Sequence, residues 1–495
     1  MAIREPGRSL QLTNLPPKGV KRRRVHLLRW PRQWLLESCG DLPVPHIRER
    51  SLPVKIVPNP EAGPERRKEL QTRYYGSFRC LADACPDTCC EGWRVALDKK
   101  TYSKYQQCSD PVLQPAFQQL ITINPASTSD DTYATFTTSN ARCTFLSEGL
   151  CSIQSRLGEQ YLGAACAAFP RVTNLANGVV ERSLDLSCPE AARLALLNPT
   201  PLEFCLVDTD VADIQKDVAQ TSYGRLLESA FSSASGLEHS RGAHERIAEV
   251  RQFVLSLLQN RKYPLSKRLI LLGHFCDKLR EIITEGNYQA VPELLQGFAF
   301  AIEAGLFNDY LSRCTASPAA QLGIVLELIA ERVKSDFTHR RFLQFYQEFI
   351  NGIRWKPDAT HEEMAGHYAD AYRRQYAPFM SQHEYMLENY LVNNAFRTLF
   401  PFGSQSMTRA LNMDALRAVA AHYMLLTSYF SILKAMLIGL AGNRGAAFGT
   451  EDVIRGVQLC SKTFEHSVTY PKRILEILAM HGIETPAGMR VLTQN

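Results

Sequence analysis

A cluster of cysteines is the part of this sequence with the clearest capacity for chemistry. Cys80, Cys85, Cys89 and Cys90 lie within eleven residues with the spacing C-x4-C-x3-C-C, and nine of the chain's 14 cysteines fall between Cys80 and Cys188. Such a density is typical of a metal site or a disulfide framework. A helical turn would place Cys85 and Cys89 on one face. No histidine occurs in this part of the chain, so all-thiolate ligation or disulfides are expected instead of a Cys/His zinc finger.

The cellular compartment decides between these two interpretations. The first ten residues, MAIREPGRSL, carry charges and lack the apolar run of a secretory signal peptide. We therefore expect a cytoplasmic protein, in which structural disulfides are rare and thiolate ligation of a metal is favoured. A set of inert buried thiols is a third interpretation. The adjacent pair Cys89 and Cys90, with the polar neighbours Asp87 and Thr88, fits it poorly.

A second group of thiols has wider spacing. It begins at Cys143 and follows the pattern C-x7-C-x14-C-x21-C. One continuous helix from Cys151 to Cys166 would be about 22 Å long, so its two ends could not bind one cluster. Gly158 and Gly163 interrupt this stretch. We expect either that the chain turns there or that the two thiols serve different sites.

The segments after the second group predict the elements that position the last thiol. Residues 171–184 alternate like a β-hairpin around Asn177 and Gly178, a favoured two-residue turn. Pro189 is typical of a first helical residue. Cys188 would then be the N-cap, where the helix dipole favours the thiolate.

After Pro201 the chain changes to apolar residues that recur every three and four positions, which predicts helices. The most apolar stretch, Ala415–Leu440, contains Lys434 and is expected to be a buried core helix and not a membrane span. We therefore expect a mainly α fold with a Cys-rich metal-binding N-terminal domain that contains a small β-hairpin, followed by an all-helical C-terminal domain. The expected divisions are a basic, Pro-rich arm at 1–72, the Cys-rich domain at 73–206 and the helical domain at 207–495.

The N-terminal arm carries most of the positive charge. Residues 1–80 contain 17 Lys and Arg against 7 Asp and Glu, whereas the whole chain has a net charge of +6. Prolines recur through the arm and no strand alternation persists, so we expect it to be poorly ordered. The basic and apolar run Lys21–Trp30 allows a peripheral contact with an acidic membrane surface. A solvated appendage is the simpler interpretation, and no nucleic-acid partner is expected.

Four long segments of the sequence belong together: Phe78–Tyr105 (FRCLADACPDTCCEGWRVALDKKTYSKY), Cys143–Arg171 (CTFLSEGLCSIQSRLGEQYLGAACAAFPR), Ser183–Leu197 (SLDLSCPEAARLALL) and Glu388–Gly403 (ENYLVNNAFRTLFPFG). In order and content they resemble the flagellin lysine N-methylase family of bacteria. The resemblance implies transfer of methyl groups from S-adenosylmethionine to the ε-amines of flagellin lysines, with flagellin as the protein partner. It also implies a protein-bound 4Fe-4S cluster held by the cysteine motif.

On this resemblance, eight cysteines are candidate ligands of the cluster. Three cysteine ligands would leave one iron open, which could chelate the amino and carboxylate groups of S-adenosylmethionine. We expect Cys85, Cys89 and Cys90 to be ligands, completed by Cys151 or Cys166. Because eight thiols exceed the need of one cluster, some would bind zinc or be structural. The candidates are Cys80, Cys85, Cys89, Cys90, Cys143, Cys151, Cys166 and Cys188.

The other candidate site residues are chosen by residue type within the family-like segments. An acceptor lysine must lose a proton, which favours a nearby carboxylate or tyrosine, and aromatic faces hold ammonium groups. Amides on an apolar helix could bind polar groups of S-adenosylmethionine. The opposing interpretation is that the tyrosines are core aromatics, the acids solvated or capping, and the amides satisfied inside the core. The candidates are Tyr161, Asp185, Glu388 and Tyr390 for catalysis and Asn389 and Asn393 for cofactor binding.

Two functions of different classes follow from the sequence. The first is a cytoplasmic S-adenosylmethionine-dependent protein-lysine N-methyltransferase that acts on flagellin. The alternative is a non-catalytic zinc-binding interaction module whose helical domain docks a partner. The chain has neither the glycine-rich turn of a Rossmann-type methyltransferase nor the radical-enzyme spacing C-x3-C-x2-C. The sequence therefore does not reveal the site of the methyl donor.

Overall fold

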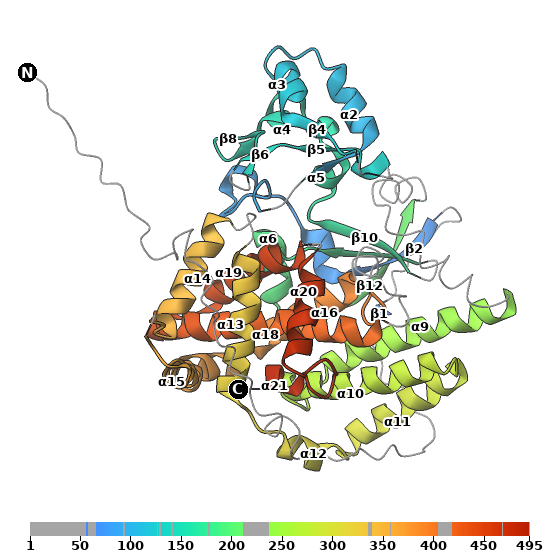
Figure 1. Cartoon of the computed structure of the whole chain (residues 1–495). Coiled ribbons are helices and arrows are strands. Elements are labelled where there is room, and N and C mark those ends of the chain that lie inside the picture. The colour runs from blue at the N-terminus through green and yellow to red at the C-terminus, as the bar shows by residue number, and fades with distance from the viewer. Residues whose placement is uncertain are drawn as a thin grey trace, which may run out of the picture. The chain divides into compact units, whose positions relative to one another are not determined.

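The structure is a computed structural model, and it is mostly helical, which confirms the expected mainly α class (Figure 1). All described residues belong to one compact unit, Ser38–Asn495. Residues 1–55, for which disorder and a membrane contact are expected, lie outside the described residues, so both expectations stay predictions. The domain boundary expected after residue 206 also stays a prediction. The structure describes residues 56–57, 66–92, 95–125, 127, 130–139, 142–176, 179–210, 237–334, 339–356, 358–403, 418–467 and 469–494.

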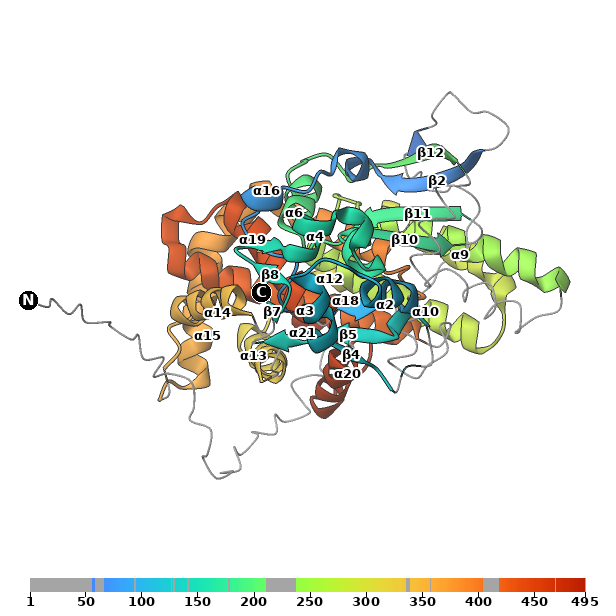
Figure 2. The ribbon, with the colours of Figure 1, turned by 90° about the horizontal axis from the view of Figure 1, so that it is seen from above.

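Five strands form one mixed sheet, four of which lie side by side in Figure 2. Two of them are the predicted hairpin, which pairs antiparallel from Arg171 opposite Leu184 to Ala176 opposite Val179. This confirms the hairpin, whose expected turn at 177–178 lies outside the described residues. In spatial order the strands are β1 (Ile56–Val57), β12 (Phe204–Asp210), β2 (Arg66–Thr72), β11 (Val179–Leu184) and β10 (Arg171–Ala176).

Strand β2 corrects the expectation that residues 1–72 lack regular structure. It pairs antiparallel with β12 along its whole length, Arg66–Thr72, and parallel with β11. Its sequence, RRKELQT, has no clear alternation. The strand forms nevertheless, because backbone hydrogen bonds with partners distant in the chain stabilise it on both sides. Strand β12 also continues to Asp210, past the expected boundary. The described chain is therefore all-helical only from Leu237 onward.

The Cys-rich part of the chain has a small hydrophobic core of its own. Tyr105 and Phe117 stack with their ring centroids 4.1 Å apart, and Cys143 is buried among the same aromatic side chains. A three-stranded sheet in the order β3-β5-β4 covers this core. The elements are β3 (Ala96–Leu97), α2 (Lys99–Gln106), α3 (Leu113–Leu120), β4 (Ile121–Ile123), η3 (Asp130–Thr132), β5 (Ala134–Phe136), β6 (Thr138–Ser139), β7 (Arg142–Cys143), β8 (Leu146–Ser147) and β9 (Leu150–Cys151).

The chain turns between Cys151 and Cys166, as the sequence predicts. The first short helix ends at Gly158, whose φ of +86° is a conformation that favours glycine. Gly163 precedes the next helix as its N-cap. The two thiols therefore come from separate elements and not from the ends of one rod. These elements are α4 (Ser152–Leu157), η4 (Glu159–Tyr161) and α5 (Ala164–Ala168).

The termini of two other elements give one confirmation and one correction. Cys188 is the N-cap of α6 (Pro189–Leu196), as predicted. The helical turn expected through Cys85 is wrong, because the 3-10 turn η2 (Ala82–Ala84) ends before it and Cys85 is extended, with φ −69° and ψ 128°. The next residue, Pro86, explains the difference, since a proline ring disfavours the helical conformation of the preceding residue.

The rest of the described chain consists of helices, including those predicted from apolar periodicity. Two five-residue π-helical segments interrupt them, η6 (Tyr372–Tyr376) and η8 (Ser461–Glu465). Such segments are frequent at functional sites. The helices are α9 (Leu237–Leu258), α10 (Leu265–Thr284), α11 (Val291–Glu303), α12 (Asn308–Arg313), α13 (Pro318–Val333), α14 (Arg340–Gly352), α15 (His361–Ala371), α16 (Ala377–Arg397), α18 (Val419–Arg444), α19 (Thr450–Cys460), α20 (Tyr470–Met480) and α21 (Arg490–Thr493), with 3-10 turns η1 (Arg73–Ser77), η5 (Tyr288–Ala290) and η7 (Gly445–Ala447).

Helix α18 is the central helix of this part of the chain (Figure 1), in contact with α10, α13, α14, α15, α19, α20 and α21. By length and composition the stretch Val419–Ala447 is long and apolar enough to cross a membrane, but its most apolar window is entirely buried in the protein. Backbone carbonyls of neighbouring helices accept hydrogen bonds from its polar side chains, at 2.9 Å from Tyr423 and at 2.7 Å from Ser431. These contacts confirm the expected buried core helix.

Candidate functional site

Segments that are far apart in the sequence meet at the last turns of α16. Arg397 Nη1 donates to Asp185 Oδ2 at 3.1 Å, although 212 positions separate the two residues. On the same helix, Asn393 Nδ2 donates to the carbonyl of Leu184 at 3.1 Å. The backbone N–H of Asp185 donates to the carbonyl of Pro170 at 2.8 Å. Three of the four family-like segments are therefore in direct contact at this point.

A cluster of buried polar side chains, here called the polar centre, surrounds this contact. Glu465 at the end of η8 accepts hydrogen bonds from Tyr390 Oη at 2.9 Å and from Asn394 Nδ2 at 3.0 Å. It also forms an ion pair with Arg397. The carboxylates of Asp185 and Glu465 are only 7% and 6% exposed. The polar centre consists of Asp185, Tyr390, Asn394, Arg397, Glu465 and His466.

Asp185 has two further partners besides Arg397. The backbone N–H of Ser187 donates to its Oδ1 at 2.9 Å, and His466 Nε2 lies 3.4 Å from the same oxygen. The same His466 nitrogen lies 3.1 Å from Ser187 Oγ. A Ser-His-Asp catalytic triad uses opposite imidazole nitrogens for the serine and the aspartate. The shared nitrogen therefore shows that these three residues are not arranged as a triad.

The polar centre has an excess of negative charge. Asp185 and Glu465 are two carboxylates that share the single guanidinium of Arg397, which gives a net charge of −1 when His466 is neutral. Burial alone would raise the pKa of Asp185, but the Arg397 guanidinium and then His466 outweigh it and hold this pKa well below its usual range. Burial, followed by the charge of Glu465, raises the pKa of Tyr390. Its hydroxyl is therefore a neutral hydrogen-bond donor near neutral pH.

The other two residues predicted for catalysis lie outside the polar centre. Glu388 is fully buried and accepts hydrogen bonds from Arg261 at 2.8 Å and from Arg268 at 2.6 Å. A buried carboxylate between two arginines is typical of a structural ion pair. Tyr161 lies in the Cys-rich part, where the ammonium of Lys104 is 4.0 Å from its ring centroid. Two of the four predicted residues are thus together and two are elsewhere, and their catalytic roles stay predictions.

The two asparagines predicted to bind the methyl donor make contacts within the fold. Asn389 Nδ2 donates to the carbonyls of Ala195 at 3.0 Å and Asn198 at 2.9 Å, at the end of α6. Asn393 Oδ1 accepts a hydrogen bond from Tyr74 Oη. Both amides therefore tie α16 to neighbouring segments, although Asn389 Oδ1 is buried with no hydrogen-bond partner among the described residues. A role in binding S-adenosylmethionine stays a prediction.

The eight cysteines predicted as metal ligands fall into two neighbouring groups. The pKa of Cys166 is raised, mainly by burial and further by the charges of Cys151 and Cys143. Cys188 likewise has Cys85 as an electrostatic neighbour. The thiols of each group are therefore near enough to influence one another. The first group is Cys89, Cys90, Cys143, Cys151 and Cys166, and the second is Cys80, Cys85 and Cys188; the charge of Cys89 also acts on Cys85, so the two groups adjoin.

The described thiols lie in one region of the fold but do not form a site that could bind a single metal ion. None of the thirteen described cysteines is in a disulfide. Across the described ranges, no three or more His, Cys, Asp or Glu side chains are arranged to hold a metal ion. At Cys188 the backbone N–H groups of Ala191 and Glu190 lower the pKa, as expected for an N-cap, but burial outweighs them and raises it to about 12. The role of the eight cysteines as metal ligands stays a prediction.

The loop that carries the cysteine motif is anchored beside the polar centre. Lys462 Nζ on η8 lies 2.9 Å from Asp87 Oδ2. Gln458 Nε2 on α19 donates to the same oxygen at 2.8 Å and to the carbonyl of Ser187 at 2.9 Å. Because Lys462 and Glu465 belong to one π-helical segment, η8 supports both the cysteine loop and the polar centre.

Sequence reasoning did not select four members of the polar centre, namely Asn394, Arg397, Glu465 and His466. Arg397 lies within a family-like segment, but an arginine in the last turn of a helix is also explained by the helix dipole. Glu465 and His466 stand in no recognisable motif. Their spacing gives no sign that they would meet Asp185, so only the fold reveals them.

Comparisons with known proteins give the chain its relatives. A family model described as the FliB lysine N-methylase C-terminal domain matches residues 251–492. The Flagellar biosynthetic protein FliU of Salmonella muenchen is 33% identical over 123 residues, which cover 25% of this chain and 73% of that protein. The Lysine-N-methylases of Salmonella typhimurium (strain LT2) and Salmonella choleraesuis are 33% identical over 123 residues, 25% of this chain and 31% of each enzyme. The aligned segment thus spans less than a third of these two enzymes. No solved structure matches the chain.

Proposed function

This chain belongs to the flagellin lysine N-methylase family, and on that basis we propose that it is a protein-lysine N-methyltransferase. The methyl donor would be S-adenosylmethionine, and the acceptors would be the ε-amines of flagellin lysines. The names of the relatives, Lysine-N-methylase and Flagellar biosynthetic protein, support the reaction and a flagellar substrate. Methylation would take place in the cytoplasm, before flagellin leaves the cell.

The polar centre is the observation that carries this proposal, because family-like segments converge on it. A lysine acceptor arrives as an ammonium ion, and the net charge of −1 shared by Asp185 and Glu465 attracts it. The ammonium must then pass a proton to a nearby carboxylate, since only the neutral amine has a lone pair to attack. In a polar transfer the new nitrogen–carbon bond forms as the carbon–sulfur bond of the sulfonium breaks, which leaves a thioether.

We place an iron–sulfur cluster in the Cys-rich part as a second element of the proposal. Thiolates are the usual protein ligands of such clusters, so the donor set fits in its chemistry. Each iron takes its own thiolate, and the ligands of a cluster therefore stand further apart than those of one zinc ion. When bound, the cluster would offer an open iron for the amino and carboxylate groups of S-adenosylmethionine. Three thiolates would hold it, drawn from Cys85, Cys89 and Cys90 with Cys151 or Cys166, since a fourth cysteine ligand would occupy the open iron.

Mass spectrometry of flagellin tests the reaction. Protein purified without oxygen is incubated with S-adenosylmethionine and flagellin, and the added methyl groups are counted from the mass. Asp185→Asn should slow methylation about tenfold to a hundredfold, since a charge-assisted contact contributes about 1.5–3 kcal/mol. The matched control Asp309→Asn alters an exposed aspartate on α12 and should keep the wild-type rate.

The outcomes of this experiment separate two claims. Unmodified flagellin after incubation with the wild-type protein would overturn the proposed reaction. Equal rates for Asp185→Asn and Asp309→Asn would leave the reaction standing and remove the polar centre from it. Circular dichroism of both variants shows whether a lost rate reflects lost folding.

Colour and metal content test the cluster. The protein purified without oxygen should be brown and contain iron. Cys89→Ser should bleach it, whereas Cys205→Ser, a half-buried thiol on β12 outside the proposed ligands, should keep both colour and iron. Full iron retention in Cys89→Ser would refute the ligand assignment. A colourless protein that holds zinc would instead support the non-catalytic zinc-binding module.

A further inference from the structure

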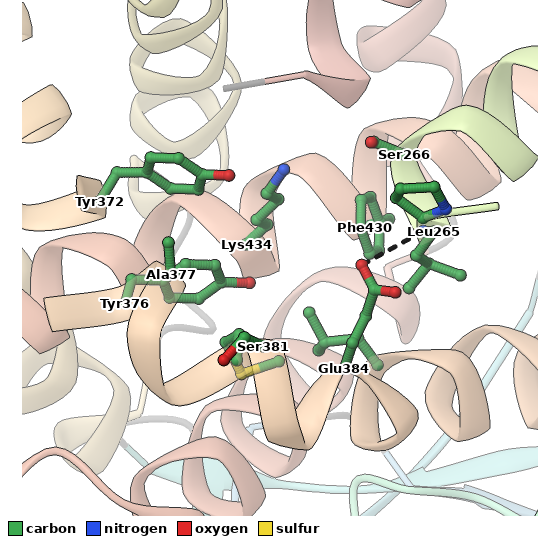
Figure 3. Close-up of a pocket in the computed structure, with 12 residues that line it drawn as sticks. Leu265, Ser266, Tyr372, Tyr376, Ala377, Ser381, Glu384, Phe430 and Lys434 are labelled. Carbon is green, nitrogen blue, oxygen red and sulfur yellow. Dashed lines mark hydrogen bonds between the residues drawn. The ribbon is translucent and has the colours of Figure 1, made fainter. Parts of the chain in front are cut away.

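A second site of interest is a cavity of about 240 Å³ among the helices, away from the polar centre (Figure 3). It lies between the start of α10, the π-helical segment η6 with the first half of α16, and the middle of α18. Glu384 and Arg397 stand about 20 Å apart along α16, so the cavity and the polar centre are separate. The lining side chains that matter below are Leu265, Tyr372, Tyr376, Glu384, Phe430 and Lys434.

Lys434 brings a positive charge to this cavity, and none of the described residues gives it an anionic partner. The residue is 7% exposed, and its Nζ donates to the carbonyl of Thr493 at 3.3 Å. No carboxylate of the described residues lies within ion-pair distance of it. Burial lowers the pKa of Lys434 to about 8, so most molecules keep the charge near pH 7. A buried ammonium with one backbone contact has donors to spare for an anion.

Two tyrosines add neutral donors beside this charge. Tyr372 and Tyr376 come from η6 and line the cavity with Lys434, whose Nζ is 5.8 Å from the ring centroid of Tyr372. Their hydroxyl groups have no hydrogen-bond partner within the described part of the chain. Figure 3 shows both hydroxyls directed toward the interior of the cavity. A carboxylate placed beside Lys434 would therefore meet hydroxyl donors as well.

Glu384 supplies the opposite charge from α16 (Figure 3). Its Oε1 accepts a hydrogen bond from the backbone N–H of Leu265 at 3.2 Å, and its Oε2 lies 3.3 Å from Arg268 Nη2. Its side chain is 43% exposed, so the carboxylate is held in place and still reachable. A carboxylate has about four acceptor positions, and these two contacts leave room for a ligand ammonium.

We propose that this cavity binds a free α-amino acid with an apolar side chain. The ligand carboxylate would bind Lys434 and the tyrosine hydroxyls, and its α-ammonium would bind Glu384. The side chain would pack against Leu265 and Phe430. An apolar cavity of about 150 Å³ accommodates benzene, so about 240 Å³ is enough for an amino acid the size of leucine or methionine.

The two charges distinguish this ligand from simpler ones. A lysine side chain of a protein substrate would bring only a cation and would meet the repulsion of Lys434. An inorganic anion or a plain fatty acid would give the free acceptor positions of Glu384 no donor and would bring a second negative charge close to it. Only a zwitterion satisfies both. The site goes beyond the proposed function, because it depends neither on methyl transfer nor on a cluster.

Calorimetric titration of the full chain tests the site with defined probes. L-leucine and L-methionine should bind saturably at millimolar concentrations, whereas L-leucinamide lacks the carboxylate and 4-methylpentanoate lacks the ammonium, and both should bind at least about tenfold more weakly. Lys434→Met should weaken L-leucine binding about tenfold or more and leave the protein folded, since it removes a buried charge. The matched control Lys278→Met alters an ion-paired surface lysine on α10 and should bind like the wild type.

Each outcome bears on the proposal. The proposal is supported if Lys434→Met loses L-leucine binding, Lys278→Met keeps it and Tyr376→Phe binds L-leucine with lower affinity than the wild type. No saturable binding of either amino acid, or equal binding by the two lysine variants, overturns it. Equal affinity for 4-methylpentanoate and L-leucine would show a plain carboxylate site and overturn the zwitterion. Methylation of flagellin is measured separately, so failure of one proposal does not imply failure of the other.

Discussion

Replacing Arg397 by methionine should destabilise the protein strongly, because it leaves two buried carboxylates without their cation. Asp185 and Glu465 are 7% and 6% exposed, and Arg397 itself is 14% exposed, so solvent screens these charges little. Removing one partner of a buried ion pair costs about 3–5 kcal/mol. We expect the free energy of unfolding to fall by at least that amount, measured by urea denaturation followed by circular dichroism.

The cost of Arg397→Met should depend on pH in a defined direction. In the wild type the pKa of Asp185 is lowered, so its stabilising contribution is present above the unfolded value of about 3.9 and is lost as the pH falls below it. Without Arg397, burial raises this pKa, and the penalty exists only while the carboxylate is charged. The destabilisation should therefore shrink between about pH 7.5 and about pH 5. Asp185→Asn added to Arg397→Met should restore about 1–3 kcal/mol.

An exposed ion pair on the same part of the chain provides the matched control. Arg373 pairs with Asp370 at 2.6 Å, with side chains 66% and 49% exposed. Surface pairs of this kind contribute about 0.2–1 kcal/mol, so Arg373→Met should change the free energy of unfolding by that amount at most. A cost of Arg397→Met no greater than that of Arg373→Met, or an equal cost at both pH values, would refute the expected role of this buried ion pair.

Two further predictions concern Gly403 and His422. Gly403 has φ +83°, and an added Cβ would lie 1.5 Å from His422 Cε1, whereas Gly482 has φ +69° and open space. Gly482→Ala should therefore cost about 1–2 kcal/mol in urea denaturation, and Gly403→Ala about 1–3 kcal/mol more; equal costs would contradict the contact. Burial lowers the pKa of His422 to about 4, so stability should be complete above about pH 6.5 and decline by about 3 kcal/mol towards pH 4. His422→Phe should flatten this decline in stability. His367→Phe is the control, and an equal flattening in that variant would contradict the assignment to His422.

The features that the sequence predicted well are those with local causes. The β-hairpin follows from alternation, and the start of α6 follows from Pro189 beside Cys188. Apolar periodicity predicted that most of the chain after Pro201 is helical. Lys434 within the most apolar stretch indicated that α18 is a buried core helix and not a membrane span. The break at Gly158 was one of two alternatives that followed from helix length and from the two glycines in this stretch. The absence of the helical turn considered at Cys85 also has a local cause, since Pro86 stands next to it in the sequence.

The features that the sequence did not predict depend on contacts between distant segments. Strand β2 has little alternation of its own and is stabilised by β11 and β12. The polar centre joins Asp185 to Arg397 and to Glu465 across three separate elements, and no spacing in the chain relates them. Polar residues of this kind look alike in a sequence whether they face solvent or one another. The amide of Asn389 was likewise ambiguous until its backbone partners were known.

The position of β2 has a practical consequence for anyone who expresses fragments of this protein. A fragment that starts at Arg73, where the Cys-rich domain was expected to begin, would lack the strand that lies between β12 and β11. Those two strands would each expose an unpaired edge, and exposed edges recruit other chains into aggregates. Insolubility of such a truncation would therefore report a missing central strand, and a shorter deletion that ends before Ile56 is the sounder choice.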